Sequence, residues 1–410
     1  MAKKFDFEPL FSKDTPADAR GAVKRGKYDF AVAYPDPESV PIDGLWQALR
    51  DAIQKEGKGM AIYPPPQGHI GMRELLVEKF TEDRGMTVAK EDIVLGNGSG
   101  QGITLLCQIL VNQGDVVLTE DNVYVGTLRT LRRFKADVRG IPTDDNGIIP
   151  EELEALLKQL AAEGKTVKFI YTIPTFQNPM GSVLPLERRK QLLQIAYKYN
   201  VPIMEDDCYV DLAYEGDVPP AIHSLDDRGQ VMYVGSVSKI IAPGVRLGWA
   251  VGPQSVVGRL LNVKLDGGAN ELAAMAINLY LRREMDSHIS EICAILREKR
   301  DAMLSALGEY FPPSCKWTKP KGGLFIWLTL PEGVDASAFR EKALDADVGY
   351  MPGVNFSPSG QAKNSLRLCF GFNTPDEIKE GIRRLAEVFE REGAFKQASG
   401  SAPSRKRSVR

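Results

Sequence analysis

The feature that most constrains the fold is an alternation of short apolar runs with longer amphipathic stretches between residues 93 and 234. The apolar runs have the length and composition of buried strands, and the stretches between them have helical periodicity. The predicted strands are 93–95, 115–119, 137–141, 168–173, 201–204 and 231–234, and the predicted helices are 103–111, 125–134, 151–162 and 187–199. Strands joined through helices run parallel, so this order predicts an α/β fold with a mainly parallel sheet and helices on both faces.

The pattern differs on either side of this alternation. A short amphipathic helix is predicted at residues 42–53, and a long helix at 271–307 is followed by strand-like runs and a helix at 376–389, which together indicate a smaller α+β domain. We therefore divide the chain into an N-terminal arm with part of the small domain (1–60), a large domain (61–285), the small domain (286–395) and a basic tail (396–410). The tail has too few apolar residues to fold and is predicted to be disordered.

The composition limits the possible partners. The 410 residues carry a net charge of −2, which gives no overall attraction to nucleic acid or to an anionic membrane. No apolar run has the length of a membrane span, and the N-terminus lacks the apolar core of a secretory signal. The five cysteines lack Cys-x-x-Cys spacing and there are only three histidines, so neither a disulfide framework nor a metal site is expected. We expect a cytoplasmic protein that acts on small molecules.

The stretch 235–249 lies between two apolar strand-like runs and places Lys239 on their connection. A lysine held among apolar neighbours can lose its proton and attack a carbonyl group. Ser236, Ser238 and Arg246 are close enough in sequence to hold a dianion beside it. This pattern is typical of a site that binds an aldehyde cofactor carrying a phosphate group. The alternative is a capped turn with a solvated lysine.

A glycine-rich turn follows the first predicted strand. In open α/β sheets ligands bind at the carboxyl ends of the strands, and backbone N–H groups at the start of the next helix can hold a phosphate. Gly98, Ser99 and Gly100 are the candidates. The dinucleotide motif Gly-x-Gly-x-x-Gly is not matched, and no Gly-Lys-Ser/Thr of a P-loop is present. A simple tight turn remains the alternative.

Three further strand ends carry polar or aromatic candidates. Tyr124 follows the second strand and could stack on a flat heterocycle, although a tyrosine at such a place, taken alone, belongs to the core more often than not. Asn178 is fixed in extended backbone by Pro179, so its amide could be aimed at a ligand oxygen, or it could form an Asx turn. Asp206 could keep a pyridine nitrogen protonated, and Tyr209 could reach a ring hydroxyl. A metal site at the acidic residues 205–207 would need further ligands.

Because these residues follow the strands in this order, the chain resembles the fold-type I pyridoxal phosphate enzymes. The resemblance is strongest to the class I/II aminotransferases, which have the aspartate aminotransferase fold. The subgroup that the chain resembles is the 2-aminoadipate, kynurenine and aromatic aminotransferases, which are also similar to the aminotransferase half of MocR-type regulators. The resemblance covers residues 28–389. Its most specific parts are Asn178-Pro179, the spacing of Asp206 and Tyr209, the Ser-x-Ser before Lys239, and residues 364–368 around Arg367.

The resemblance implies a role for each candidate. Lys239 forms the Schiff base with pyridoxal 5′-phosphate, Asp206 pairs with the ring nitrogen, and Arg367 binds the substrate α-carboxylate. Asn178 and Tyr209 bind the ring hydroxyl, and Tyr124 stacks on the ring. The implied phosphate ligands are Gly98, Ser99, Gly100, Ser236, Ser238 and Arg246. The resemblance also implies a homodimer with shared active sites, in which Tyr63 reaches the phosphate held by the other subunit.

The chain departs from the family where the amino acid would bind. Val32, Ala33 and Tyr34 replace a usual glycine pair, and Tyr34 is a candidate substrate contact. Three other departures are Asn122, Met180 and Val237. None removes a cofactor contact, but each changes the shape offered to the substrate, so the amino donor and acceptor stay open.

The function expected from these residues is transfer of an amino group between an α-amino acid and a 2-oxo acid. A lyase, a decarboxylase or a carbon–carbon bond-forming synthase could use the same cofactor site, because those reactions share a carbanion. A ligand-sensing module derived from such an enzyme is the third possibility.

Overall fold

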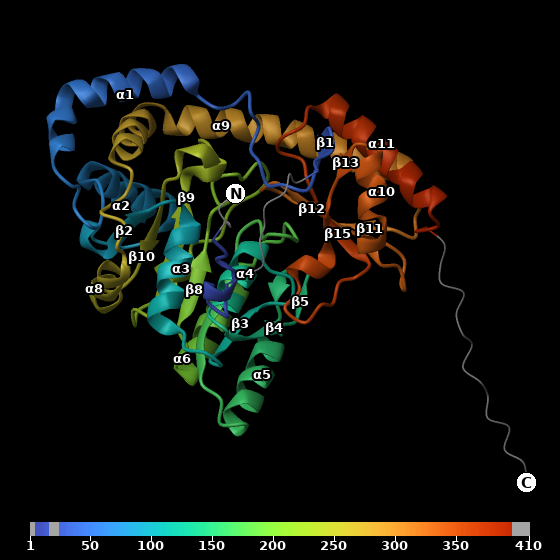
Figure 1. The fold of residues 1–410 in the computed structure, drawn as a ribbon, viewed down its shortest axis with the longest axis horizontal. Coiled ribbons are helices and arrows are strands. Elements are labelled where there is room, and N and C mark those ends of the chain that lie inside the picture. Colours follow the sequence, from blue (N-terminus) through green and yellow to red (C-terminus); the bar gives the residue numbers. More distant parts are fainter. Residues whose placement is uncertain (1–4, 16–23, 396–410) are drawn as a thin grey trace, which may run out of the picture.

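The computed structural model describes residues 5–15 and 24–395. Its centre is a seven-stranded sheet in the order β2-β10-β9-β8-β7-β3-β4 (Figure 1). The strands are β2 (Ile93–Gly96), β3 (Val116–Glu120), β4 (Asp137–Ile141), β7 (Val167–Thr172), β8 (Ile203–Asp206), β9 (Val231–Ser236) and β10 (Gly248–Val251). β10 is antiparallel to both neighbours, and the pairs from β9 through β4 are parallel. The predicted mainly parallel sheet is confirmed.

Alternate side chains of the strands contact helices on opposite faces of the sheet. In β3, Val116 and Leu118 belong to one buried cluster and Val117 to another, as expected for a strand that is covered on both sides. The helices α5 and α6 supply the first cluster, and α3 and α4 contribute to the second. The helices of this domain are α2 (Ile70–Arg84), α3 (Ser99–Leu110), α4 (Val125–Arg133), α5 (Pro150–Ala162), α6 (Leu186–Tyr199), α7 (Ile222–Leu225) and α8 (Gln254–Val263).

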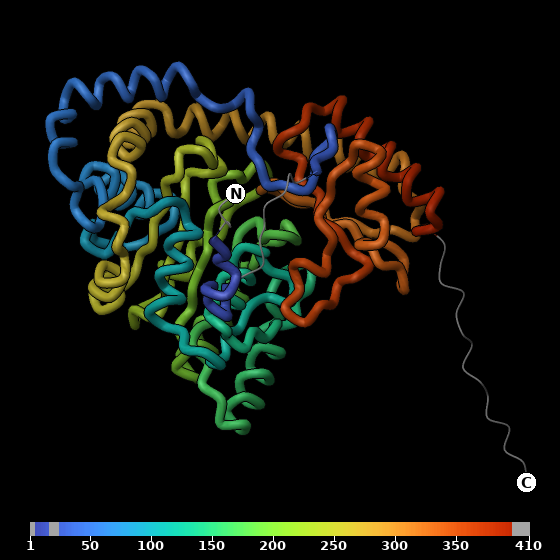
Figure 2. Tube along the Cα trace, in the orientation of Figure 1, coloured from blue at the N-terminus to red at the C-terminus, as the bar shows by residue number. Residues whose placement is uncertain are grey.

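A second, four-stranded antiparallel sheet in the order β11-β12-β15-β14 forms the smaller domain. Its strands are β11 (Lys316–Trp317), β12 (Phe325–Thr329), β14 (Met351–Pro352) and β15 (Ser365–Cys369), and its helices are α10 (Arg340–Asp345) and α11 (Pro375–Arg391). Two-residue pairs complete the strands: β1 (Tyr28–Asp29) pairs parallel with β13 (Val348–Gly349), and β5 (Thr143–Asp144) pairs with β6 (Gly147–Ile148). The N-terminal part of the chain therefore joins the small domain, as the trace in Figure 2 shows.

One helix connects the two domains. α9 (Glu271–Tyr310) runs 40 residues without a break and contacts α1 (Ile42–Glu56) and α2 at one end and α11 at the other. The predicted boundary at residue 285 falls inside this helix, and the division into domains stays a prediction. The predicted tail, 396–410, and parts of the predicted arm lie outside the described residues.

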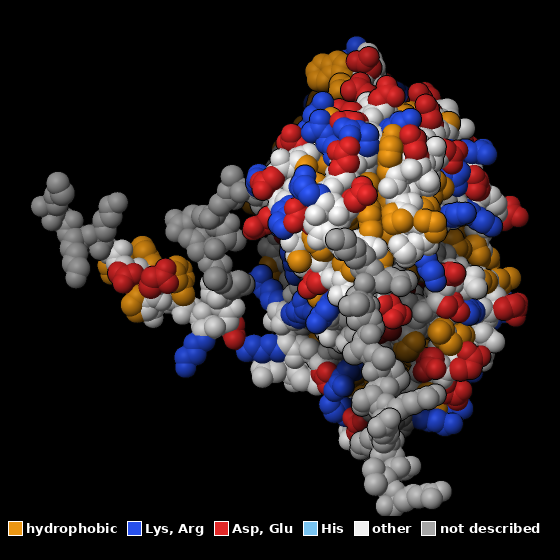
Figure 3. Space-filling model, turned by 90° about the vertical axis from the view of Figure 1, so that its right-hand side faces the viewer, with side chains coloured by type: hydrophobic (Ala, Val, Ile, Leu, Met, Phe, Trp, Pro, Cys, Tyr) orange, Lys and Arg blue, Asp and Glu red, His pale blue; other side chains and the backbone are white. Residues whose placement is uncertain are grey.

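Element types agree with the sequence predictions more closely than element ends do. α3 begins at Ser99, four residues before the predicted start, because Gly98 takes a φ of +81° directly before it and lets the chain turn straight into the helix. None of the helices in the described residues is long and apolar enough to cross a membrane. On the face seen in Figure 3, positive and negative side chains are interspersed, so that face offers no field of a single sign.

Candidate active site

The predicted site residues other than Tyr63 meet at one edge of the large sheet. β7, β8 and β9 run parallel, so the residues that follow their carboxyl ends, Asn178, Asp206 and Lys239, come to the same edge. β2 is antiparallel to β10, which brings the turn before α3 to that edge as well. The small domain adds Arg367 from β15, through a hydrogen bond to Asn178.

Lys239 ends a short 3₁₀ turn (Val237–Lys239) between β9 and β10. Its Nζ donates a hydrogen bond to the carbonyl oxygen of Ala33 at 2.7 Å. Burial lowers the pKa of the Lys239 ammonium, and the nearby guanidinium groups of Arg367 and Arg246 lower it further, against the opposite effect of Cys369 and Cys208. The amine therefore loses its proton more easily than a surface lysine does, which favours nucleophilic attack.

Asp206 ends β8 and is 3% exposed. The Tyr171 hydroxyl donates a hydrogen bond to its Oδ2 at 2.6 Å, whereas Oδ1 has no hydrogen-bond partner among the described residues. Burial raises the pKa of this carboxyl group. A buried carboxylate oxygen without a donor is costly, so the geometry fits a ligand that brings an N–H group, as a protonated pyridine nitrogen does.

Asn178 connects the two domains by hydrogen bonds. Its Nδ2 donates to the hydroxyl oxygen of Tyr209 at 3.0 Å, and its Oδ1 accepts from Nη1 of Arg367 at 3.0 Å. Arg367 also donates to the carbonyl oxygen of Ala31, and its guanidinium lies 4.7 Å from the ring centre of Phe325. These contacts hold the guanidinium in one orientation, ready for a planar anion.

The predicted phosphate ligands surround the N-terminus of α3. The first N–H groups of a helix lack partners within it, and here they follow Gly98. Gly98 is favoured by its φ of +81°, and a Cβ atom there would also push against Nη2 of Arg246 at 2.7 Å. A Cβ atom at Gly248 would lie 2.5 Å from the backbone N of Ser99, so that position requires glycine. Gly100 faces open space, since no heavy atom of the described residues lies within 4 Å of a Cβ placed there.

The serines and the arginine of the Lys239 segment complete this cradle. The Ser236 hydroxyl accepts a hydrogen bond from the backbone N–H of Ser238 at 3.2 Å, and both serines are buried. Arg246 has a φ of +53° and donates from Nη2 to the carbonyl oxygen of Asn97 in the glycine turn. The arginine thereby links the lysine segment to the helix that follows β2. Backbone N–H groups, hydroxyls and a guanidinium form the donor set that a phosphate dianion requires.

The aromatic candidates differ in their placement. Tyr124 directly precedes α4 and is 37% exposed, and burial together with the charge of Asp206 raises the pKa of its hydroxyl. The Tyr34 ring lies 5.7 Å from that of Phe372, next to the Ala33 carbonyl that holds Lys239. Tyr63 is 88% exposed, and the structure does not bring it to the other candidates.

Sequence reasoning missed Tyr171 and the Ala33 carbonyl. Tyr171 lies in the predicted strand 168–173 and has the appearance of a core aromatic, but its hydroxyl is the donor to Asp206. The one available signal was its place, because a tyrosine near the carboxyl end of a strand beside the Asp206 strand can reach the same edge. A backbone carbonyl carries no sequence signal.

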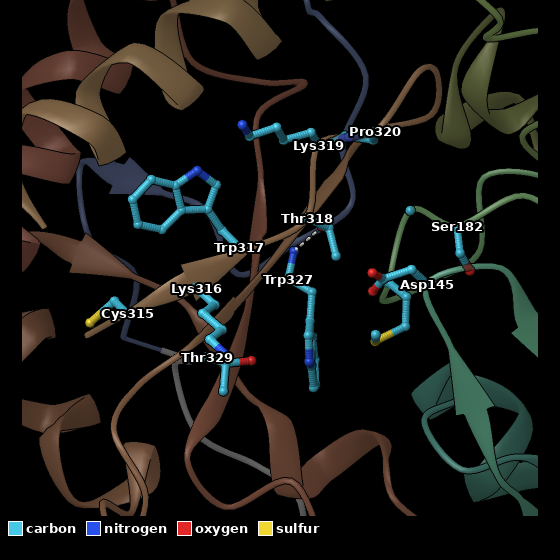
Figure 4. A pocket seen from close by; sticks show the side chains of 12 residues that line it. Asp145, Ser182, Cys315, Lys316, Trp317, Thr318, Lys319, Pro320, Trp327 and Thr329 are labelled. Carbon is cyan, nitrogen blue, oxygen red and sulfur yellow. Dashed lines mark hydrogen bonds between the residues drawn. The ribbon is translucent and has the colours of Figure 1, made fainter. Parts of the chain in front are cut away.

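A recess of about 760 Å³ lies beside this site rather than in it (Figure 4). Met180, Gly181 and Ser182 border it from the large domain, and Trp327 is among its small-domain residues. The predicted site residues are not among those that border it. In the described residues, no group of three or more His, Cys, Asp and Glu side chains could hold a metal ion.

Comparison with known proteins identifies the family. The profile of the family "Aminotransferase class I and II" matches residues 31–385. The chain belongs to this family. The predicted activity, aminotransfer, and the predicted cofactor, pyridoxal 5′-phosphate, are those of such enzymes, and the donor sets described above fit that cofactor's ring and phosphate.

Three relatives of this aminotransferase match over almost their whole length. It is 37% identical to an aromatic-amino-acid aminotransferase of Thermococcus litoralis, with 88% of each chain covered. It is 30% identical to the 2-aminoadipate transaminase of Thermus thermophilus, with 88% of this chain and 90% of the relative covered. The crystal structure of Pyrococcus horikoshii kynurenine aminotransferase superposes with a TM-score of 0.88 at 34% identity, covering 94% of this chain and 98% of that one. These matches confirm the predicted fold and subgroup.

Proposed function

We propose that this aminotransferase uses Lys239 both to hold the cofactor and to move the substrate proton, as it transfers an amino group between an α-amino acid and a 2-oxo acid. The observation that carries the proposal is the half-buried Lys239 side chain, whose pKa is lowered by removal from water and whose Nζ donates a hydrogen bond to the Ala33 carbonyl. A neutral amine in this place can remove a proton from the substrate α-carbon. As Lys239 turns toward the substrate, it leaves the Ala33 oxygen.

The remaining residues bind and orient. Pyridoxal 5′-phosphate, when bound, supplies an electron-accepting ring that stabilises the negative charge left by the α-proton. Asp206 would accept the ring N–H on Oδ1, which has no partner among the described residues, while Tyr171 holds Oδ2. Tyr209 and Asn178 would bind the ring hydroxyl, and Tyr124 would stack on the ring. The phosphate ligands that we propose are Gly98, Ser99, Gly100, Ser236, Ser238 and Arg246.

Arg367 binds the substrate α-carboxylate in this proposal. Its guanidinium is buried, donates to Asn178 and the Ala31 carbonyl, and retains Nε without a partner among the described residues. Two parallel N–H groups match the two oxygens of a carboxylate, which a lysine cannot reproduce.

The substrate side chain that we propose is a large one, since the relatives are named for aromatic amino acids, 2-aminoadipate and kynurenine. Tyr34 is the candidate contact. It follows the carbonyl that holds Lys239, and its hydroxyl accepts a hydrogen bond from Arg25 at 3.0 Å. Family membership favours transamination over elimination, decarboxylation or carbon–carbon bond formation.

We also propose that two copies of the chain share their active sites. Large apolar side chains are exposed along α1 and on the following loop, among them Trp46 (62%), Ile62 (75%) and Tyr63 (88%). Exposed apolar side chains that adjoin one another mark an interaction surface. A second copy seated there would cover Tyr63 and bring its hydroxyl to the partner's phosphate ligands. The cytoplasmic location stays a prediction.

The experiment mixes the purified holoenzyme with a panel of amino acids and 2-oxo acids and measures new amino acid and new 2-oxo acid in equal amounts. Borohydride reduction followed by peptide mapping must label Lys239. The variant Lys239→Ala must lose the label and multiple turnover, whereas Lys198→Ala, at the exposed end of α6, must keep both. Carbon dioxide or ammonia as the main product would refute transamination.

A further inference from the structure

A buried carboxylate, Glu120, is linked by hydrogen bonds to the residue next to Asn178, which we assign to the cofactor ring. It ends β3 and is 3% exposed. Its Oε1 accepts hydrogen bonds from the Thr172 hydroxyl at 2.7 Å and from the Ile173 N–H at 2.9 Å. Its Oε2 accepts from Nε2 of Gln177 at 3.2 Å. Glu120 therefore joins the carboxyl end of β3 to that of β7, the strand beside it.

Gln177 extends this link in both directions. Its Nε2 also donates to the carbonyl oxygen of Asn122 at 2.6 Å, and its Oε1 accepts from the Met180 N–H at 2.7 Å. The Asn122 carbonyl lies two residues before Tyr124, and Gln177 directly precedes Asn178. One amide side chain thus connects the loop that carries the ring-stacking tyrosine with the loop that carries the amide for the ring hydroxyl.

The orientation of the Gln177 amide is fixed, because Met180 needs an acceptor and the Asn122 carbonyl needs a donor. Its second N–H must therefore meet an acceptor at position 120. An aspartate at position 120 would be one carbon too short to reach Gln177. A glutamine there would place its NH₂ group against one of the donors that Glu120 accepts from, or force the Gln177 amide to turn over. If the Gln177 amide turned over, its oxygen would face the Asn122 carbonyl oxygen, and its NH₂ group would face the backbone N–H of Met180.

We propose that Glu120 and Gln177 are positioning residues, which do not touch the cofactor but set Tyr124 and Asn178 around it. The inference rests on the proposed roles of those two residues. Asn178 in turn holds Arg367, so the pair also governs the orientation of the proposed carboxylate ligand. Two loops that are far apart in the sequence are thereby held as one unit before the cofactor arrives, which is how preorganised sites gain affinity.

The charged neighbours of Glu120 support this assignment. Burial raises the pKa of Glu120 to about 7, its three hydrogen-bond donors lower it, and the charge of Asp206 raises it. Burial raises the pKa of the Tyr171 hydroxyl, which donates to Asp206, and the charges of Asp206 and Glu120 raise it further. The carboxylate at this position costs free energy on burial, and it supplies the acceptors that all three donors need.

The chain offers a matched control in Glu205, the neighbour of Asp206 in β8. Glu205 is fully buried, accepts two backbone N–H groups, from Ile222 at 2.9 Å and His223 at 2.8 Å, and has a pKa that burial raises to about 7. It belongs to the other face of the sheet, away from the ring ligands. Glu205 also pairs with Arg189 at 3.8 Å, and Arg189 donates to the Pro174 carbonyl and the Thr175 hydroxyl. Glu205→Gln therefore reproduces the loss of a buried carboxylate while the hydrogen bonds of Glu120 and Gln177 stay in place.

The test compares Glu120→Gln, Gln177→Ala and Glu205→Gln as holoenzymes and as apoproteins reloaded with pyridoxal 5′-phosphate. We expect the first two variants to weaken cofactor affinity about ten- to hundredfold, the factor for one or two lost hydrogen bonds at a charged site. We also expect them to shift the visible absorption band of the bound cofactor and its pH midpoint. Glu205→Gln should lower the melting temperature and leave affinity and spectrum as in the wild type.

Each outcome decides the inference. Glu120→Gln or Gln177→Ala with wild-type affinity and spectrum overturns it, and so does a loss of affinity in Glu205→Gln equal to theirs. Should Glu120→Gln fail to fold, Gln177→Ala decides, because it leaves Glu120 its donors from Thr172 and Ile173. A wild-type protein that binds no pyridoxal phosphate would instead refute the proposed function.

Discussion

Arg367→Lys tests the proposed carboxylate site most directly, because it keeps the positive charge and removes only the pair of parallel N–H groups of the guanidinium. In the wild type Arg367 donates from Nη1 to Asn178 and from Nη2 to Ala31, and its guanidinium lies near the rings of Phe325 and Phe356. A lysine ammonium is a point charge and cannot hold Asn178 while it also binds both oxygens of a carboxylate.

The expected loss follows from those contacts. One hydrogen bond to a charged group contributes about 1.5–3 kcal/mol, and the released Asn178 amide adds about 1 kcal/mol. A total of about 3 kcal/mol corresponds to a decrease in kcat/KM of about a hundredfold for the amino acid. The affinity for pyridoxal 5′-phosphate should fall by no more than about fivefold, the factor for the ~1 kcal/mol released at Asn178, since Arg367 itself is not among the proposed cofactor ligands.

The assay is the single-turnover reaction of the holoenzyme with an amino acid, followed by the absorbance of the cofactor. Arg300→Lys is the matched control, because Arg300 is equally buried and donates to Glu215 and to the Pro320 carbonyl, outside the proposed site. A kcat/KM for Arg367→Lys within threefold of the wild type would show that another group binds the α-carboxylate. An equal loss in Arg300→Lys would show a general effect on the small domain.

Three further predictions concern other parts of the molecule. Asp206→Asn should lower kcat about a hundred- to thousandfold while the protein still binds pyridoxal phosphate, measured by turnover and equilibrium dialysis. A near-wild-type kcat would show that Asp206 does not act on the ring nitrogen. Trp46→Glu should yield monomers in light scattering and weaken cofactor binding, because Tyr63 would lose the second subunit; a monomeric wild type contradicts this. Glu205 has a folded pKa of about 7, above its unfolded value, so its contribution to stability is present below pH 4.5 and lost as the pH rises through 7. The difference in unfolding free energy between the wild type and Glu205→Gln should therefore fall by on the order of 3 kcal/mol over that window in urea titrations, and a constant difference would refute the shift.

Local sequence signals predicted the parts of the site that one strand end can supply. Asn178, Asp206 and Lys239 each follow an apolar run, and a parallel sheet collects such positions at one edge. Arg367 has no comparable signal, because it belongs to an antiparallel strand of the other domain, and only the family resemblance indicated it. The links between distant segments could not be predicted either. Glu120 meets Gln177 across 57 positions and Lys239 meets Ala33 across 206, and no local period encodes such distances.

The uninterrupted α9 restricts how the two domains can move. A continuous helix of 40 residues contains no loop that could act as a hinge. On this side of the molecule, a change in the angle between the two sheets must therefore bend α9. Bending a helix allows only a small rotation of one domain against the other, whereas a hinge in a loop allows a large one. The distance between Lys239 in the large domain and Arg367 in the small domain can therefore change only as far as α9 bends.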